Sequence, residues 1–192
     1  MRHALVLTLC LALMPAHATE KSPLERGDYG PLDKAPESAL YDYPIQVSER
    51  VYSAIGATQP PTYQNAGHNN NLSFVIGDDA VLVVNGGSNN ALARALHAEI
   101  RKITDLPVKY VISENGQGHA YLGNHYWKSE GATLIGHADA QHEIEAKGYG
   151  SLTNMRRYAQ GFAEDTELVN FDITFEDRYE LDLGNVRVVA KI

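Results

Sequence analysis

The sequence predicts a mixed α/β domain, and three observations support this fold class. Short runs rich in β-branched residues alternate with stretches of helical periodicity. Turn sequences separate neighbouring runs, as at Gly77-Asp78-Asp79 and Gly184-Asn185. The chain has 192 residues, of which 44% are hydrophobic and 21% charged. That length and composition are enough for one domain with a hydrophobic core.

The N-terminal residues 1–18 are typical of a secretory signal peptide. A basic start, Met1–His3, precedes an apolar run, Ala4–Met14, and Ala16–Ala18 supplies a small-x-small cleavage site. The apolar run is too short to span a bilayer. Cys10 lies within this segment and is the only cysteine, so the mature chain would have no disulfide and no thiolate ligand. We expect a periplasmic or secreted protein without a membrane span.

The net charge of −8 limits the partners that the chain can bind. An acidic surface repels polyanions, so we expect no nucleic-acid binding and no attraction to anionic membranes. Residues 19–46 contain recurrent prolines among charged and small residues and predict an extended arm or linker. The domain is then expected to occupy residues 47–192.

The elements of this domain follow in order. Arg50–Ile55 predicts a strand, and Leu72–Ile76 with Ala80–Val84 predicts a β-hairpin. A helix over 91–104 is predicted because apolar residues recur at helical spacing on one face, and Asn89 or Asn90 would cap its start. The later predicted elements are a strand at Val108–Ile112, a short helix containing Tyr121, Leu122 and Trp127, a strand at Thr133–Ile135, a helical stretch over Ala138–Ala159 broken at Gly148 and Gly150, and strands at Tyr179–Leu183 and Val186–Ala190.

The loop that follows Val108–Ile112 is the first place to look for chemistry, because strand-to-helix loops often carry catalytic groups in α/β proteins. Two histidines at i and i+2 in such a loop make half of a zinc site, but Asn115 and Gln117 occupy those positions here. His119 could bind a metal and lacks a partner at useful spacing. His137 and His142 are five residues apart and would lie on different faces of a helix.

Other catalytic motifs are absent from the sequence. It contains no Gly-x-Ser-x-Gly, and the glycines at 116 and 118 are not followed by Gly-Lys-Ser or Gly-Lys-Thr. His68 lies in a polar loop, and His97 lies outside the apolar stripe of its helix, so each is predicted to be a surface or core histidine. The residues by themselves indicate no active site.

Two longer stretches resemble the metallo-β-lactamase superfamily. GHNNNLSFVIGDDAVLVVNGG, residues 67–87, is similar to its opening hairpin, and LPVKYVISENGQGHAYLGN, residues 106–124, is similar to its metal-motif loop. GATLIGHADA (131–140) and YELDLG (179–184) also fall where the family has them. Within the superfamily the chain resembles exported zinc metallohydrolases associated with quinoprotein dehydrogenase systems. The resemblance implies an αββα sandwich, of which 47–192 would be the N-terminal half, and a zinc-dependent hydrolase as the family activity.

The metal motif of the family, His-x-His-x-Asp-His, falls here on Asn115, Gln117, His119 and Ala120. Asn85 stands where the family usually has a supporting aspartate. Further ligands of the family lie in a segment beyond the position of Ile192, so we expect a truncated chain. A full structural zinc site contributes about 10–16 kcal/mol, of which one imidazole supplies a fraction. We therefore expect no tightly bound zinc and no other cofactor.

Three functional hypotheses follow. The first is a non-catalytic, degenerate protein or pseudogene product. The second is a pseudoenzyme that keeps a binding role, for example as a periplasmic accessory protein of a quinoprotein dehydrogenase system, because an uncovered apolar sheet would need a partner. The third is a zinc-dependent hydrolase with an unusual site built from His119, Glu114 and His125.

Overall fold

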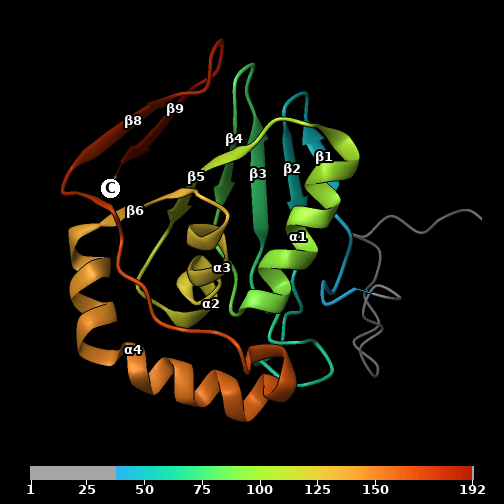
Figure 1. Cartoon of the computed structure of the whole chain (residues 1–192), viewed down its shortest axis with the longest axis vertical. Helices are drawn as coiled ribbons and strands as arrows, with labels where there is room; N and C mark the ends of the chain where they lie inside the picture. The colour runs from blue at the N-terminus through green and yellow to red at the C-terminus, as the bar shows by residue number, and fades with distance from the viewer. Residues whose placement is uncertain (1–37, 192) are drawn as a thin grey trace, which may run out of the picture.

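The computed structural model describes residues 38–191, which form a seven-stranded sheet, a two-stranded sheet and helices (Figure 1). The signal peptide predicted at 1–18 and most of the predicted arm lie outside the described residues. The strands are β1 Ile45–Ser48, β2 Val51–Ala54, β3 Leu72–Ile76, β4 Val81–Val84, β5 Val108–Ser113, β6 Thr133–His137, β7 Ile173–Phe175, β8 Arg178–Asp182 and β9 Arg187–Lys191. The helices are α1 Asn90–Ile103, α2 Gly118–Tyr121, α3 Asn124–Ser129 and α4 Ala138–Ala159, followed by the 3-10 helix η2 Gln160–Ala163.

The large sheet keeps the order of the sequence, β1-β2-β3-β4-β5-β6-β7. The first four strands pair antiparallel, whereas β4 to β7 pair parallel because helices connect them. The mixed α/β fold class is therefore confirmed. Since the last four strands run the same way, their carboxyl ends meet along one edge.

The two faces of the sheet are covered by different layers. Along β4, Val81 and Val83 point into the core shared with α1 and α3, and Leu82 and Val84 point to the opposite side. That opposite side is covered by the β8–β9 hairpin, whose Leu183 is 1% exposed. In Figure 1 the hairpin is seen at the upper left, on the other side of β4 from α1. This face therefore carries a second, two-stranded sheet, whereas the second functional hypothesis assumed an uncovered sheet.

Most predicted elements are confirmed within a residue or two of their ends. The N-cap of α1 is Asn89, whose side chain accepts a hydrogen bond from the Leu92 N–H at 2.9 Å. Strands β1 and β7 were not predicted, since each has three or four residues and a partly exposed burial pattern. The chain also joins the core earlier than residue 47, because Leu40 is fully buried.

The predicted break in the long helix is wrong, since α4 continues through Gly148 and Gly150. Gly148 is buried, and a Cβ there would lie 3.3–3.4 Å from Leu168 and the Tyr121 hydroxyl. The close packing of α4 on α2 therefore uses the missing side chain, and this contact outweighs the low helix propensity of glycine.

Gly150→Ala is expected to raise the free energy of unfolding by about 0.5–1 kcal/mol, because a Cβ at Gly150 meets nothing within 4 Å and alanine favours the helix. Urea denaturation measures the change. Gly148→Ala is the matched control and should gain nothing, since its Cβ enters a packed interface. A loss of stability in Gly150→Ala would contradict the continuous helix.

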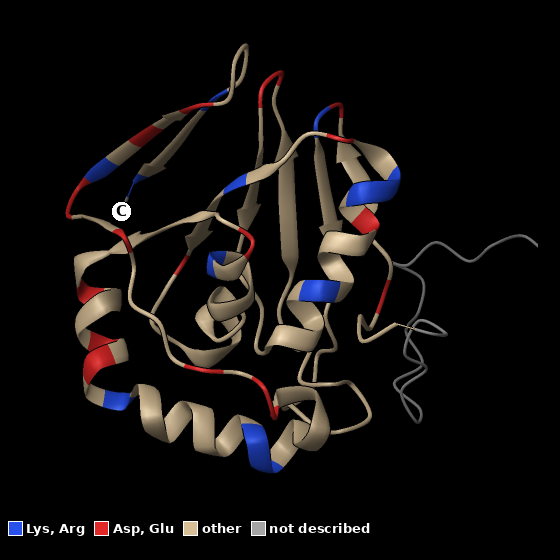
Figure 2. Cartoon of the chain, viewed as in Figure 1, with Lys and Arg blue, Asp and Glu red and all other residues tan. Residues whose placement is uncertain are grey.

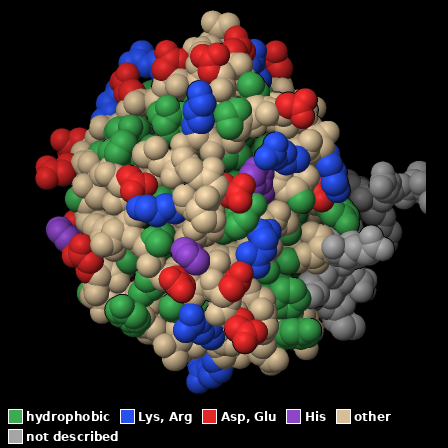
Figure 3. All heavy atoms as spheres, in the orientation of Figure 1, with side chains coloured by type: hydrophobic (Ala, Val, Ile, Leu, Met, Phe, Trp, Pro, Cys, Tyr) green, Lys and Arg blue, Asp and Glu red, His purple; other side chains and the backbone are tan. Residues whose placement is uncertain are grey.

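Among residues 38–191, no helix is long and apolar enough to cross a membrane. On the face seen in Figure 3, basic and acidic side chains are interspersed and form no continuous basic area.

Candidate functional site

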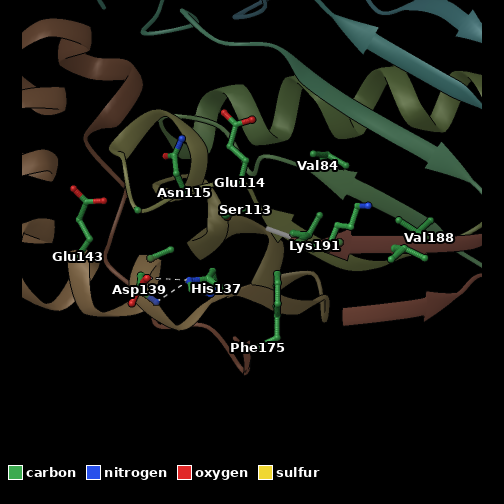
Figure 4. A pocket seen from close by; sticks show the side chains of 15 residues that line it. Val84, Ser113, Glu114, Asn115, His137, Asp139, Glu143, Phe175, Val188 and Lys191 are labelled. Carbon is green, nitrogen blue, oxygen red and sulfur yellow. Dashed lines mark hydrogen bonds and ion pairs between the residues drawn. The ribbon is translucent and has the colours of Figure 1, made fainter. Parts of the chain in front are cut away.

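A cavity of about 630 Å³ opens between the large sheet and the β8–β9 hairpin (Figure 4). Four of its lining residues end the four parallel strands: Val84 of β4, Ser113 of β5, His137 of β6 and Phe175 of β7. The cavity thus lies at the carboxyl edge of the parallel strands, where ligands bind in open α/β sheets.

The inner walls of the cavity are apolar. Val84 and Ile112 project from the large sheet, and Val188 and Ala190 face them from β9. Phe175 closes one side, with its ring centroid 5.6 Å from that of His137. Apolar walls with a few polar groups at the mouth are typical of small-molecule sites.

The mouth of the cavity is polar and carries Glu114 and Asn115 from the β5–α2 loop, Asp139 and Glu143 from α4, and Lys191 from β9. Figure 4 shows these side chains around the opening, with Glu143 and Asp139 on the α4 side. The first turns of α4, which border the cavity, carry acidic residues in Figure 2.

His137 uses both ring nitrogens within the fold. Its Nδ1 accepts a hydrogen bond from the Asp139 N–H at 3.1 Å, and its Nε2 donates to the Glu176 carbonyl. In this pattern Nε2 is the donor and Nδ1 the acceptor. Both ring nitrogens are thus engaged within the fold, so His137 caps the start of α4 and contacts the residue that follows β7.

The loop between β5 and α2 is held by side-chain amides. The Asn115 Oδ1 accepts from the Gln117 N–H at 2.8 Å, an Asx turn that shapes the loop. The Asn85 Oδ1 accepts from the Glu114 N–H at 3.1 Å, while its Nδ2 donates to the Asn71 carbonyl at 3.4 Å. A carboxylate at position 85 could not donate, so the amide suits this position. Asn85 also has a φ of 66°, a conformation that asparagine tolerates.

The sequence-predicted candidates do not converge. His119 on α2 lies with its Nε2 3.9 Å from the Glu114 Oε1, and it is absent from the lining of the cavity. Burial lowers the pKa of His119, and the Glu114 charge opposes this shift. His125 instead contacts Asn90 of α1 at 3.0 Å and Glu167 at 3.9 Å. Within 38–191, no three His, Asp or Glu side chains are grouped so that they could hold a metal ion.

The sequence matches no protein-family model and no curated protein. The structure of this chain matches 173 chains of solved structures. One of these is a metallo-beta-lactamase from Pontibacter korlensis, at a TM-score of 0.55 over 75% of this chain and with 12% sequence identity. The chain has a metallo-β-lactamase fold. It spans 57% of the length of that relative. The narrower resemblance to zinc metallohydrolases of quinoprotein dehydrogenase systems stays a prediction.

The zinc that a metallo-β-lactamase fold implies does not fit the residues at the motif positions. Asn115 and Gln117 are neutral amides, which are poor zinc ligands, and Asn115 already holds the loop. Ala120 is fully buried and has no donor atom. Only His119 could coordinate, and zinc needs about three protein ligands. The residues at the motif positions therefore do not fit a zinc ion.

Sequence reasoning missed the cavity residues on α4 and β9. Asp139, Glu143 and Lys191 lie far along the chain from the β5–α2 loop and meet it only through the parallel strands and the hairpin. One signal could have indicated the α4 residues. They follow the predicted strand at Thr133–Ile135, and the carboxyl ends of neighbouring parallel strands share an edge.

His97 and His68, each predicted to be a surface or core histidine, are both buried. His97 is 9% exposed because α3 places Tyr126 and Trp127 over it, and its Nδ1 bonds the Tyr126 hydroxyl at 2.8 Å. His68 is fully buried, and its Nδ1 accepts from the Tyr41 N–H at 2.8 Å. Burial lowers the pKa of His68 from 6.5 to about 4.

Acid is expected to destabilise the fold through His68. The unfolded chain takes up this proton near pH 6.5 and the folded chain only near pH 4, so between these values the unfolded state holds more protons. The free energy of unfolding therefore falls as the pH falls through this window, by about 3 kcal/mol in all. Urea denaturation at pH 7, 6, 5 and 4 measures the slope.

The matched variant is His68→Asn, whose Oδ1 can replace Nδ1 as the acceptor for Tyr41 and does not titrate. The free energy of unfolding of this variant should change less with pH over this range than that of the parent protein. The remaining slope includes His97 and His119, whose pKa values burial also lowers. Equal slopes in the two proteins would contradict the role of His68.

Proposed function

We propose that this chain is an exported, non-catalytic protein of metallo-β-lactamase fold that binds a small molecule in the cavity between its two sheets. The observation that carries the proposal is the composition of the strand-end edge. It holds a cavity of about 630 Å³, in which both ring nitrogens of His137 and the Oδ1 of Asn115 form hydrogen bonds within the fold. That volume lies in the range of small-molecule sites, about 300–1,000 Å³.

We propose the absence of hydrolysis because the motif positions supply too few donor atoms for a zinc site. Hydrolytic zinc sites need about three ligands and an open position, and the motif positions supply one imidazole. The sequence at 1–18 supports export, so we propose a periplasmic or secreted location. An accessory role beside a dehydrogenase would add a protein partner, which copurification from the periplasm would reveal.

The test is the metal content of the exported protein, purified without chelator and dialysed against trace zinc. We expect far less than one zinc per chain by mass spectrometry, and no zinc-stimulated hydrolysis of a chromogenic β-lactam. An authentic zinc hydrolase processed in parallel shows that the procedure retains metal. About one tightly held zinc per chain with zinc-dependent turnover would overturn the proposal.

The contact between His119 and Glu114 at 3.9 Å favours one alternative, an enzyme with an unusual site. A carboxylate beside a half-buried imidazole can orient it as a general base. If hydrolysis of any ester, thioester or lactam substrate is found, His119→Ala and His125→Ala separate the cases. Loss of activity in His119→Ala alone would support this alternative.

A further inference from the structure

The walls of the cavity determine the apolar part of a ligand. Val84 and Ile112 on one side and Val188 and Ala190 on the other leave a slot between two sheets, closed at one end by Phe175. A flat or extended hydrocarbon group fits such a slot and gains about 25 cal/mol for each Å² of apolar surface that it removes from water.

The mouth of the cavity determines the charge. Its charged side chains are Glu114, Asp139, Glu143 and Lys191, so three carboxylates face one ammonium group. Lys191 forms no ion pair with these carboxylates among the residues that the structure describes. An excess of negative charge at a mouth with low-dielectric walls attracts cations and repels anions.

The neighbours of the carboxylates leave much of this charge in place. Glu143 is partly neutralised by Lys147, whose Nζ lies 3.1 Å from its Oε1. The Asp139 carboxylate lies 3.6 Å from the Nδ1 of His137, and this nitrogen already accepts the Asp139 N–H. Glu114 lies 3.9 Å from His119, and burial favours the neutral form of that imidazole.

We propose that the cavity binds an organic cation with an apolar body, such as an arylalkylamine. The apolar body lies between β4–β5 and β9, and the ammonium group lies at the mouth beside Glu114 and Glu143. The inference rests on the proposed binding function and names its ligand class. The charge preference is opposite to that expected of a site that binds carboxylate ligands.

Three probes of one shape test the preference: 4-phenylbutylamine, 4-phenyl-1-butanol and 4-phenylbutyrate, which are cationic, neutral and anionic at pH 7. Calorimetric titration of the exported protein should give the order amine, alcohol, butyrate, with the amine at least about tenfold tighter than the butyrate. The preference should shrink as salt rises from about 0.02 to 0.5 M. Equal affinity for the three, or tighter binding of the butyrate, would overturn the inference.

Charge-removing variants locate the site. Glu114→Gln and Glu143→Gln should each weaken binding of the amine about three- to tenfold and leave binding of the alcohol unchanged. Glu145→Gln is the matched control on the same helix, since Glu145 is exposed and outside the cavity lining. If Glu145→Gln weakens the amine as much as the two cavity variants, the effect is one of overall charge and the inference fails.

The outcomes also separate the inference from the proposed function. A metal-free protein that binds the alcohol and the amine equally keeps its binding role and loses the cation preference. A protein whose binding requires tightly held zinc contradicts the proposed function first. A metal-free protein that binds none of the three probes contradicts the inference and the proposed use of the cavity together.

Discussion

Trp127→Ala is expected to lower the free energy of unfolding by at least about 4 kcal/mol. Trp127 is fully buried, and its ring lies 5.2 Å from that of His97 and 5.4 Å from that of Tyr126. Truncation of a buried tryptophan to alanine typically costs about 3–5 kcal/mol. Its Nε1–H also donates to the Gly86 carbonyl at 3.0 Å, and that buried acceptor would lose its side-chain partner at a further cost of about 1–3 kcal/mol.

The hydrogen bond to Gly86 gives Trp127 a role beyond packing. Gly86 and Gly87 lie in the β4–α1 loop, which also bonds the segment before α3. The Gly86 N–H donates to the Ala120 carbonyl and the Gly123 N–H donates to the Gly87 carbonyl, both at 2.7 Å. Trp127 therefore helps to set the distance between β4 and α2. Loss of the ring is expected to loosen the loop that follows β5, and with it the mouth of the cavity.

Trp127→Phe separates the two contributions, because phenylalanine keeps most of the packing and lacks the N–H. Its expected cost is about 1–3 kcal/mol. Urea denaturation followed by circular dichroism measures both variants. A cost below about 1 kcal/mol for Trp127→Ala would show that the residue is not part of the core.

The parts of the fold that the sequence predicted are those with local causes. The stripe of Leu92, Leu96 and Ile100 fixes α1 because all three are buried at helical spacing, and the turn at Gly77 fixes the β3–β4 hairpin. The break predicted within α4 failed because glycine propensity is a local quantity, whereas Gly148 is held by packing against Leu168. Contacts between segments distant in sequence cannot be predicted from the local sequence pattern.

The candidate site divides in the same way. A motif comparison within one loop was enough to notice Asn115 and Gln117 and to single out His119. It could not place Glu143 or Lys191 at the same opening, because their proximity depends on parallel pairing and on the docking of a hairpin that is distant in sequence. The sequence left open whether His68 is a surface or a core residue, because its environment is built by the distant segment around Leu40 and Tyr41.

Gly77→Ala is expected to detach the β8–β9 hairpin from the large sheet. A Cβ at Gly77 would lie 2.1 Å from the Leu183 carbonyl oxygen and 2.3 Å from the Leu183 Cβ, so the hairpin has to move. The same carbonyl accepts hydrogen bonds from the N–H groups of Asp78 and Asp79 at 2.7 and 3.2 Å. The substitution thus disrupts the contact that holds the turn of the β8–β9 hairpin against the β3–β4 turn.

The effect of Gly77→Ala should extend beyond the clash at Leu183, because a two-stranded hairpin is marginally stable alone and depends on its packing against the large sheet. Displacement of Leu183 exposes Ala80 and Leu82 beneath it and moves β9, which forms one wall of the cavity. We expect a loss of about 1–3 kcal/mol, faster hydrogen exchange in Arg187–Lys191 than in β4, and loss of binding of 4-phenylbutylamine. Gly161→Ala is the control, since a Cβ at Gly161 meets nothing within 4 Å. If Gly77→Ala keeps both the exchange protection of β9 and the binding of the amine, then the hairpin is not held at Leu183 and the cavity is not formed by its docking.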